Sequence, residues 1–325
     1  MTDQTRLSLL ADIGGTNTRV ALAEGGRLRP ETIARFLNAG RASLEEVLAE
    51  YCATREIGAL AGACVAVAGP VAVDGSSAVM TNLDWQIRAE RIAEVTGAGR
   101  VAILNDLQAQ GYALGHLAPG ATRVILPGAP APRAAGQLVI GLGTGFNAAP
   151  VHEAHGLRFV AASECGHISM PVQNARDMAL MHYVQGKHLF ASVEHVLSGR
   201  GFERVYGFVT AEAGNETLRD AAGIMAGLEA GEALAQSAGR LFVRMLGMTA
   251  GDLALVHLPF GGIYLCGGVA RAFTPWLERF GFAEAFHAKG RFSEMMEKFP
   301  ISVIEDDYAA LTGCAAHLET LAARK

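Results

Sequence analysis

The sequence has little charge of either sign and no long charged run. Lys, Arg, Asp and Glu make up only 18% of its 325 residues, and the formal net charge is -5. No block of Lys or Arg occurs along the chain, so the sequence offers no basic face for a phosphate backbone. We therefore do not expect nucleic acid as a partner.

Cysteine is also scarce. The five cysteines are odd in number and widely spaced, a pattern that argues against a disulfide framework and for a reducing compartment. The apolar run near the N-terminus is too short for a secretory signal. Residues 253–270 carry no Asp, Glu, Lys or Arg, but Pro259 and several glycines interrupt them. This stretch is typical of a buried core and not of a membrane span, so we expect a cytoplasmic protein without a membrane partner.

The length and composition predict an ordered protein of more than one lobe. Half of the residues are apolar, and glycine and proline are not concentrated in one tract. A chain of 325 residues exceeds what one compact core usually holds. We therefore expect two lobes, with an active site in a central cleft.

The first hundred residues predict an antiparallel meander followed by alternating helices and strands. Apolar patterning indicates strands at 7–12, 18–23 and 31–36, joined by glycine turns. Ser43 and Glu46 have the spacing of a capping box and predict a helix to about residue 53. Further segments are predicted as strand 62–67, helix 84–95, strand 101–105 and helix 107–117. The predicted order is βββαβαβα.

A similar meander recurs after a stretch rich in Pro, Gly and Ala at 118–136. Strands are predicted at 138–142, 146–152 and 157–161, again with a glycine turn after the first of them. A repeat this long indicates two homologous lobes and not a solenoid. Later segments are predicted as helical stretches over 175–184 and 216–256, interrupted by glycines, then strand 263–266 and helix 309–323.

The turn between the first two strands is a candidate phosphate site. A strand, a tight glycine turn and a second strand bring several backbone N–H groups together, where they can cradle an anion. A carboxylate beside the turn can hold Mg²⁺ through water, and hydroxyl and amide side chains can bind a terminal phosphate. The candidate residues are Asp12, Gly14, Gly15, Thr16 and Asn17. A lone turn of this kind is equally often a plain hairpin.

Two further glycine turns extend this pattern. The second, with Gly143, Thr144 and Gly145, takes the equivalent place in the second meander, and the third is Gly267-Gly268 after strand 263–266. No Lys-Ser or Lys-Thr follows the glycines of the first two turns, and neither turn opens a helix, so P-loop and dinucleotide-binding motifs are excluded. The third turn alone is an ordinary connection from strand to helix.

Several polar residues could act on a polyhydroxylated ligand. Asn105-Asp106 ends a buried strand, at the sheet edge where ligand sites concentrate, and Asp106 could accept a hydroxyl proton. Glu164, His167 and Glu194 also offer donors and acceptors. Each of these residues also has a purely structural interpretation. The Asn-Asp pair could cap a helix, His167 could be a buried core histidine, and Glu194 could lie on a solvated helix face. No cluster of Cys and His has zinc spacing.

Taken together, these motifs resemble those of the bacterial glucokinase family, in the superfamily of hexokinases and actin-like ATPases. The resemblance runs the whole chain. The matching segments are Leu10 to Arg19, Met80-Thr81-Asn82 with Trp85, Leu104-Asn105-Asp106, Gly143-Thr144-Gly145, Glu164 with Gly166-His167, Glu194 with Val196 to Gly199, Gly267-Gly268, and Lys289-Gly290-Arg291-Phe292. Ile168 to Pro171 stands where a related branch carries a Cys-rich zinc motif, which indicates the zinc-free branch.

The resemblance implies an α/β fold of two actin-like, ribonuclease H-like lobes, one of residues 1–108 with about 305–325 and one of 109–304. It implies that Asn105, Asp106, Glu164, His167 and Glu194 hold the sugar, with Asp106 taking the proton of its 6-hydroxyl. It also implies that ATP and Mg²⁺ occupy the three glycine turns, with Gly267-Gly268 at the adenosine, and that the protein is a homodimer. An Asp at its reference pKa of about 3.9 would be ionised at neutral pH, so this role needs no large shift in the pKa of Asp106.

Two positions depart from the family pattern. Relatives tend to have Gly where this chain has Asn147, and many have Gly in place of Cys165. We therefore expect the Asn147 amide to lie beside the nucleotide or the sugar. The alternatives that remain are a kinase for another hexose, such as fructose or mannose, and a non-catalytic nucleotide-binding regulator. A chaperone-type ATPase would need an appended domain for which the chain has no room.

Overall fold

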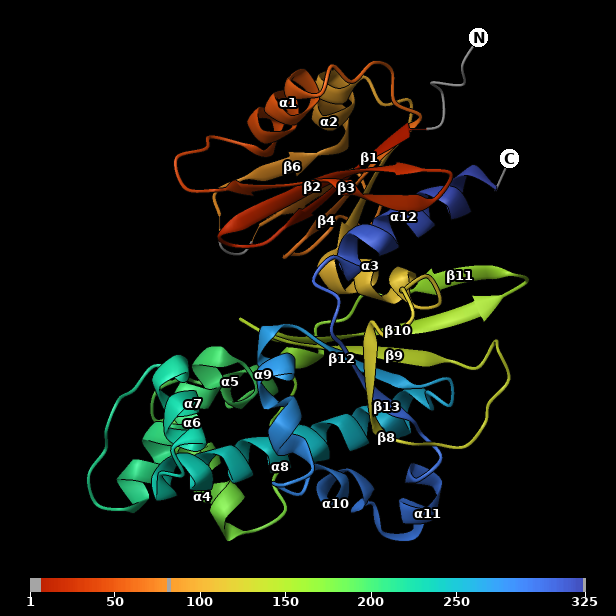
Figure 1. The fold of residues 1–325 in the computed structure, drawn as a ribbon. Helices are drawn as coiled ribbons and strands as arrows, with labels where there is room; N and C mark the ends of the chain where they lie inside the picture. The colour runs from red at the N-terminus through yellow and green to blue at the C-terminus, as the bar shows by residue number, and fades with distance from the viewer. Residues whose placement is uncertain (1–6, 81–82, 324–325) are drawn as a thin grey trace. The chain divides into compact units, whose positions relative to one another are not determined.

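The computed structural model describes residues 7–80 and 83–323, and the chain divides into two compact units (Figure 1). The first unit comprises Met1–Pro119, Ala154–Ala162 and Asp306–Lys325, and the second comprises Gly120–Glu153 and Ser163–Glu305. The lobe boundaries drawn from the sequence stay a prediction.

The first unit is built on a five-stranded sheet with the order β3-β2-β1-β4-β7. Its strands are β1 (Leu7–Ile13), β2 (Asn17–Glu24), β3 (Arg27–Leu37), β4 (Gly62–Val67) and β7 (Val101–Asn105). The first three form the predicted antiparallel meander, while β1, β4 and β7 run parallel. Because parallel strands end at one edge of the sheet, the last residues of β1 and β7 lie on the same edge.

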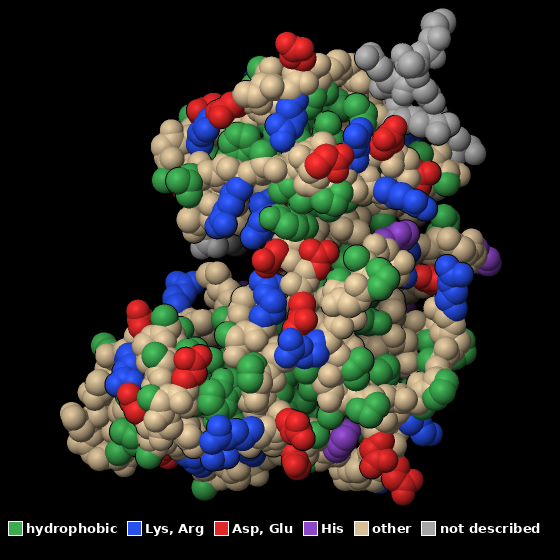
Figure 2. All heavy atoms as spheres, viewed as in Figure 1, with side chains coloured by type: hydrophobic (Ala, Val, Ile, Leu, Met, Phe, Trp, Pro, Cys, Tyr) green, Lys and Arg blue, Asp and Glu red, His purple; other side chains and the backbone are tan. Residues whose placement is uncertain are grey.

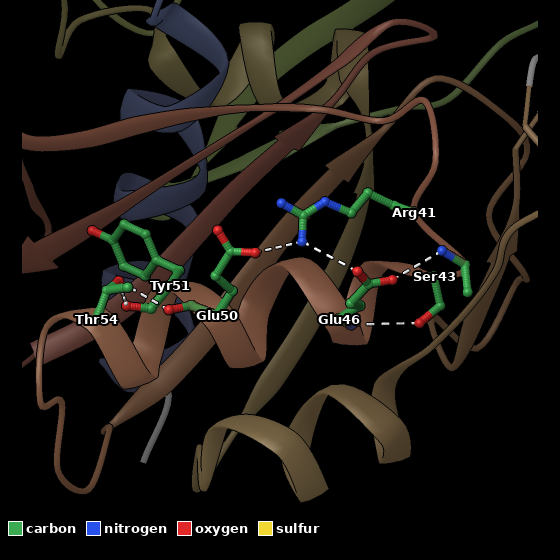
Figure 3. A network of polar contacts seen from close by, with 7 residues as sticks. Arg41, Ser43, Glu46, Glu50, Tyr51 and Thr54 are labelled. Carbon is green, nitrogen blue, oxygen red and sulfur yellow. Dashed lines mark hydrogen bonds and ion pairs between the residues drawn. The ribbon is translucent and has the colours of Figure 1, made fainter.

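The helices of the first unit are α1 (Leu44–Thr54), α2 (Ala89–Thr96), α3 (Asp106–Ala113) and α12 (Ala309–Ala322). The predicted start of α1 is confirmed, because Ser43 is its N-cap and accepts a hydrogen bond from Glu46 N (Figure 3). The Glu46 carboxylate accepts from Ala42 N at 3.0 Å, and Arg41 bridges Glu46 and Glu50. Side chains close in sequence to residue 43 therefore accept hydrogen bonds from the backbone N–H groups at the start of α1.

The prediction of a helix from residue 84 to 95 is wrong at its start. Gln86–Arg88 forms strand β6, which pairs antiparallel with β5 (Ser77–Val79), and α2 begins only at Ala89. Trp85 and Ile87 are buried, while the residues after each are exposed. This alternation has a period of two, which favours a strand over a helix.

The second sheet repeats the strand order of the first. Its order is β11-β10-β9-β12-β13-β8, from β8 (Thr122–Leu126), β9 (Gln137–Leu142), β10 (Phe146–Ala154), β11 (Leu157–Val160), β12 (Ile263–Cys266) and β13 (Ile301–Ile304). The added edge strand β8 pairs with β13 and lies inside the stretch predicted as a connection. It was not predicted, because the residues around it are rich in Pro and Gly. β13 was also not predicted.

The second unit carries most of the helices. They are α4 (Ala175–Gln185), α5 (Val193–Val196), α6 (Gly199–Glu212), α7 (Ala221–Glu229), α8 (Ala233–His257), α9 (Gly268–Leu277), α10 (Phe282–His287) and α11 (Ser293–Met296). The helical stretches predicted over 216–256 are confirmed as α7 and α8, and the predicted interruption by glycine falls at Gly231, which has a positive φ, whereas α6 was not predicted. Among the described residues, no helix is both long and apolar enough to cross a bilayer.

The core of the second unit is aromatic at its centre. The rings of Phe202, Phe242 and Phe273 lie within 5.1 Å of one another, centroid to centroid, and all three are buried. A buried carboxylate also fixes α4, since Asp177 binds Arg244 of α8 and accepts hydrogen bonds from Asn174 N, the N-cap residue, and from Gln173 N before it. On the face shown in Figure 2, acidic and basic side chains are interspersed.

Candidate functional site

The first glycine turn joins β1 to β2 and is held by one amide side chain. Gly14 N donates to Asn17 O at 3.0 Å, which closes the turn. Asn38 N donates to Thr16 O at 2.9 Å, and its Nδ2 donates to Gly14 O at 2.8 Å. The buried Thr18 hydroxyl donates in turn to Asn38 Oδ1 at 2.8 Å. Asn38 therefore braces the carbonyl side of the turn and leaves the exposed residues 15 and 16 facing outward.

Asn38 was missed by the sequence analysis. It follows β3, and its partners are 20 or more residues earlier in the chain, so no local pattern connects them. A polar residue at the end of a strand is usually exposed, whereas Asn38 is 3% exposed. The observation that identifies Asn38 is a buried side-chain amide whose oxygen and nitrogen both form hydrogen bonds, and this can be seen only in the structure.

Two arginines lie close to the first turn. Arg19 Nη1 binds Asp12 Oδ2 at 3.0 Å, and Arg35 Nε donates to Asn17 Oδ1 at 3.0 Å. Burial raises the pKa of Asp12, and the Arg19 guanidinium offsets only part of that rise. A carboxylate already paired with Arg19 fits a contact to Mg²⁺ through water better than direct ligation.

Asn105 and Asp106 lie where β7 becomes α3. Asn105 is the N-cap of α3: its Oδ1 accepts from Leu107 N at 3.0 Å, and its Nδ2 donates to Gly69 O at 3.2 Å. The structural interpretation of this dipeptide, as a helix cap, thus applies to Asn105. Asp106 is the first residue of α3, and its Oδ1 accepts a hydrogen bond from Leu107 N at 2.9 Å.

Asp106 does not keep the reference pKa of an Asp. Burial, followed by the negative charge of Asp12, raises its pKa to about 6. The two carboxylates interact because β1 and β7 end at the same edge of the sheet, with β4 between them. Asp106 is therefore ionised at neutral pH, yet its affinity for a proton matches a general base better than that of an exposed Asp.

The second glycine turn joins β9 to β10 and receives the start of a helix. Gly143 N donates to Gly145 O at 3.0 Å, and Gly199 N, the first residue of α6, donates to Gly143 O at 2.9 Å. Ser198 caps α6 by accepting from Gly201 N. The N-terminus of α6 thus lies directly against the turn, whose Thr144 is exposed.

The third turn lies against the second. Gly267 has φ of 101°, and a Cβ on it would lie 2.5 Å from the carbonyl oxygen of Leu142, so only glycine fits. Gly268 begins α9, and a Cβ there would meet nothing within 4 Å. The N-termini of α6 and α9 therefore both lie beside the turn at residue 143. Helix N-termini carry partial positive charge and unpaired N–H groups, which suits the phosphates of a nucleotide.

The three predicted sugar residues of the second unit are grouped around the start of β10. The half-buried Glu194, on α5, accepts from Phe146 N at 3.0 Å through Oε2. Glu164 precedes a short 3-10 turn, Cys165–His167, and His167 N donates to Glu164 O at 3.0 Å. Glu164 and His167 are both exposed and available to a ligand.

The remaining segments of the family pattern are not all part of the candidate site. Lys289 is 7% exposed at its side chain and binds Met248 O and Asp252 of α8, so it acts in packing. Thr81 and Asn82 lie outside the described residues. Within the described part of the chain, no group of three or more His, Cys, Asp or Glu could hold a metal ion. All five cysteines are free thiols.

Comparisons with known proteins agree with this geometry. A family model described as Glucokinase matches residues 9–321. The glucokinase of Marinobacter nauticus is 31% identical over 96% of this chain and 97% of its own length. The crystal structure of a glucokinase from an Antarctic psychrotroph has a TM-score of 0.86, with 31% identity, over 96% of this chain and 98% of that one.

A more distant structure shares the fold. The glucokinase of Balamuthia mandrillaris, solved in complex with glucose, has a TM-score of 0.78 and 20% identity over 97% of this chain and 93% of that one. The predicted fold class, α/β with two actin-like lobes, is confirmed by these neighbours and by the repeated strand order of the two sheets.

Proposed function

Because this chain belongs to the glucokinase family, we propose that it transfers the γ-phosphoryl group of ATP to glucose, yielding glucose 6-phosphate and ADP. The observation that carries this function is the carboxylate of Asp106, which lies at the same sheet edge as the first glycine turn and has a pKa of about 6. A kinase for another hexose or a non-catalytic regulator is not favoured, because the family match covers nearly the whole chain.

Asp106 acts as the general base in this proposal. The Asp106 carboxylate accepts the proton of the sugar 6-hydroxyl while the oxygen of that hydroxyl attacks the γ-phosphorus, and the bond from the γ-phosphorus to ADP breaks. The Leu107 N–H holds Oδ1 at 2.9 Å and thereby fixes the orientation of the carboxylate. General-base assistance of this kind is typically worth roughly 10²- to 10⁴-fold in rate.

ATP is bound by the glycine turns in this proposal. The first turn offers backbone N–H groups with Thr16 and Asn17, and the second offers Gly143 to Gly145 with the N-termini of α6 and α9. The open space beside Gly143 and Gly268 supports this assignment, since nothing lies within 4 Å of a Cβ built on either. Phosphoryl transfer chiefly needs positioning and charge stabilisation, which such N–H groups supply. Mg²⁺, bound with ATP, neutralises phosphate charge, and Asp12 would hold one of its waters.

The sugar is held by Asn105, Glu164, His167 and Glu194 in this proposal, as the resemblance implies. Glu164 and His167 are exposed at one 3-10 turn, which supports their joint use on neighbouring hydroxyls. Asn105 Nδ2 has one N–H engaged with Gly69 O, and its second hydrogen is the group that would reach a hydroxyl. Sugar hydroxyls need both donors and acceptors, and this set supplies both.

The proposal is tested by a coupled assay with a panel of hexoses. We expect the highest kcat/KM with glucose, and lower values with mannose and fructose, using ATP as the donor and polyphosphate as its alternative. A higher kcat/KM with another hexose would replace glucose as the substrate, and no turnover of any hexose would contradict the kinase assignment.

Two further properties belong to the same proposal. We place the protein in the cytoplasm, which the free thiols of all five cysteines support. We also propose that it is a homodimer, as the resemblance implies. Light scattering on a sizing column, with a mass of 34.1 kDa per chain, checks the second statement.

A further inference from the structure

Asn147 is the second residue of β10, directly after the glycine turn at Gly143 to Gly145, and its side chain is fully engaged. Its Oδ1 accepts hydrogen bonds from Ala148 N at 2.9 Å, Cys165 N at 3.1 Å and the Ser163 hydroxyl at 3.1 Å. Its Nδ2 donates to Ser163 O and, at 3.5 Å, to Glu164 Oε2. One amide thus joins β10 to three consecutive residues, 163 to 165.

The expectation that the Asn147 amide lies beside the nucleotide or the sugar stays a prediction. The contacts that the structure shows for Nδ2 are to two protein oxygens, Ser163 O and Glu164 Oε2. The two residues that depart from the family pattern are hydrogen-bonded to each other, since Cys165 donates to the Asn147 side chain.

The neighbouring residue Phe146 makes a second link to the same segment. A Cβ on Gly166 would lie 2.0 Å from Phe146 O, so the 3-10 turn packs directly against the main chain of β10. Phe146 N is bound by Glu194. The dipeptide 146–147 therefore connects the second glycine turn to each of the carboxylates proposed to hold the sugar in this unit.

We propose that Asn147 is a positioning residue for sugar binding. It holds the 163–165 segment on β10 and orients the Glu164 carboxylate, which its Nδ2 contacts directly. This role rests on the proposed function, in which Glu164 binds a hydroxyl of glucose. Asn147 acts through Glu164 and touches neither substrate, so its loss affects sugar binding more than turnover or ATP binding.

The first test removes the amide. We expect Asn147→Ala to raise the KM for glucose about 10- to 100-fold, because several main-chain and side-chain groups lose their partner, while the KM for ATP changes less than about twofold. The matched control is Asn174→Ala, which removes an amide of the same unit that accepts from Asp177 N at 3.0 Å and caps α4. The control lowers the melting temperature and leaves both KM values unchanged.

The second test keeps the fold and changes the charge. Asn147→Asp retains Oδ1 for its three donors but replaces the donor to Ser163 O by a carboxylate oxygen, which also lies beside the Glu164 carboxylate, and like charges repel. We expect a folded protein with a lowered melting temperature and a raised KM for glucose. An unchanged KM for glucose in this folded variant would overturn the positioning role.

A double-mutant cycle identifies the partner. If Asn147 acts through Glu164, the KM for glucose of the double variant Asn147→Ala with Glu164→Gln equals that of Glu164→Gln alone. Independent, multiplying effects of the two substitutions would overturn the inference. Calorimetry of glucose binding provides the same comparison without turnover. A wild-type chain that binds glucose but does not phosphorylate it would contradict the proposed function, whereas weaker binding in Asn147→Ala would still support the inference.

Discussion

The two glycine turns occupy equivalent places in two sheets of the same strand order, yet they are held in different ways. The first is braced by Asn38, a buried amide that is bonded to the turn and to Thr18. The second is braced by the start of α6 and, through Phe146, by Glu194. The brace of the first turn has no proposed contact with a substrate, whereas a brace of the second is itself a proposed sugar residue.

This difference determines whether a substitution at a turn affects the binding of one substrate or of both. In the first unit, the turn can be altered without touching the residues proposed to hold the sugar. In the second unit, Glu194 binds the main chain of Phe146, next to the turn, and Glu164 is contacted by the side chain of Asn147. We therefore expect substitutions of Asn38, the brace of the first turn, to act on ATP alone, and substitutions of Glu194, a brace of the second, to act on both substrates. The predictions below test this contrast.

The largest effect is expected at Asp106, which belongs to the first unit but is proposed to act on the sugar. Asp106→Asn should lower kcat roughly 10²- to 10⁴-fold, because the amide cannot accept the 6-hydroxyl proton. The KM for glucose should change little, since the substitution keeps the size of the side chain. Steady-state kinetics measures both values, and a wild-type kcat in this variant would remove Asp106 from the mechanism.

The same substitution should stabilise the folded protein. The pKa of Asp106 is about 6 when folded and about 3.9 when unfolded, so the folded state binds the extra proton between these values. Stability is therefore lost as the pH rises from about 4 to 6, and an uncharged Asn escapes that loss. We expect a gain of about 1 to 3 kcal/mol in the free energy of unfolding near pH 8, which shrinks toward zero near pH 4. Urea titrations at both pH values measure this difference, and an equal gain at both would show that charge is not its cause.

The next largest effect is expected at Glu194, on the side of the second turn. Glu194→Ala leaves the N–H of Phe146 without its acceptor and removes a proposed sugar contact. We expect the KM values for glucose and ATP to rise together, by about 10- to 100-fold for glucose and less for ATP. Glu194→Gln keeps an acceptor and is the matched control, with a smaller change for ATP. If only the KM for glucose rises in Glu194→Ala, the turn and the sugar site are not coupled.

Patterns local in sequence predicted much of this fold. Strand β4 follows from an unbroken apolar run, α1 from the spacing of Ser43 and Glu46, and the repeated meander from two glycine turns with similar flanks. Strand β6 was mistaken for the start of α2 because its alternation is short and α2 follows it directly in the chain. The strand β8 gives no signal of its own, because its register is set by pairing with β13, far along the chain.

The chemistry of the site depends on contacts that no local pattern contains. The pKa of Asp106 is raised in part by Asp12, a residue from a different strand, so the sequence suggested an ordinary value. Asn147 was noticed as a departure, but its role depends on the chain at 163–165 returning to it. Asn38 was not noticed at all, since its partners are 20 or more residues away.

The smallest effect, and the sharpest test of the contrast, is expected at Asn38. Asn38→Ala removes the donor to Gly14 O and the acceptor of the Thr18 hydroxyl, and thus loosens the first turn. We expect the KM for ATP to rise about 3- to 10-fold, as for the loss of one or two neutral hydrogen bonds, while the KM for glucose stays within about twofold. Asn38→Asp keeps the acceptor for Thr18 but not the donor to Gly14, so its KM for ATP should lie between those of the wild type and Asn38→Ala. A parallel rise in the KM for glucose would mean that the first turn is tied to sugar binding as the second is, because a brace that acts only on its own turn has no means of changing the affinity for the sugar.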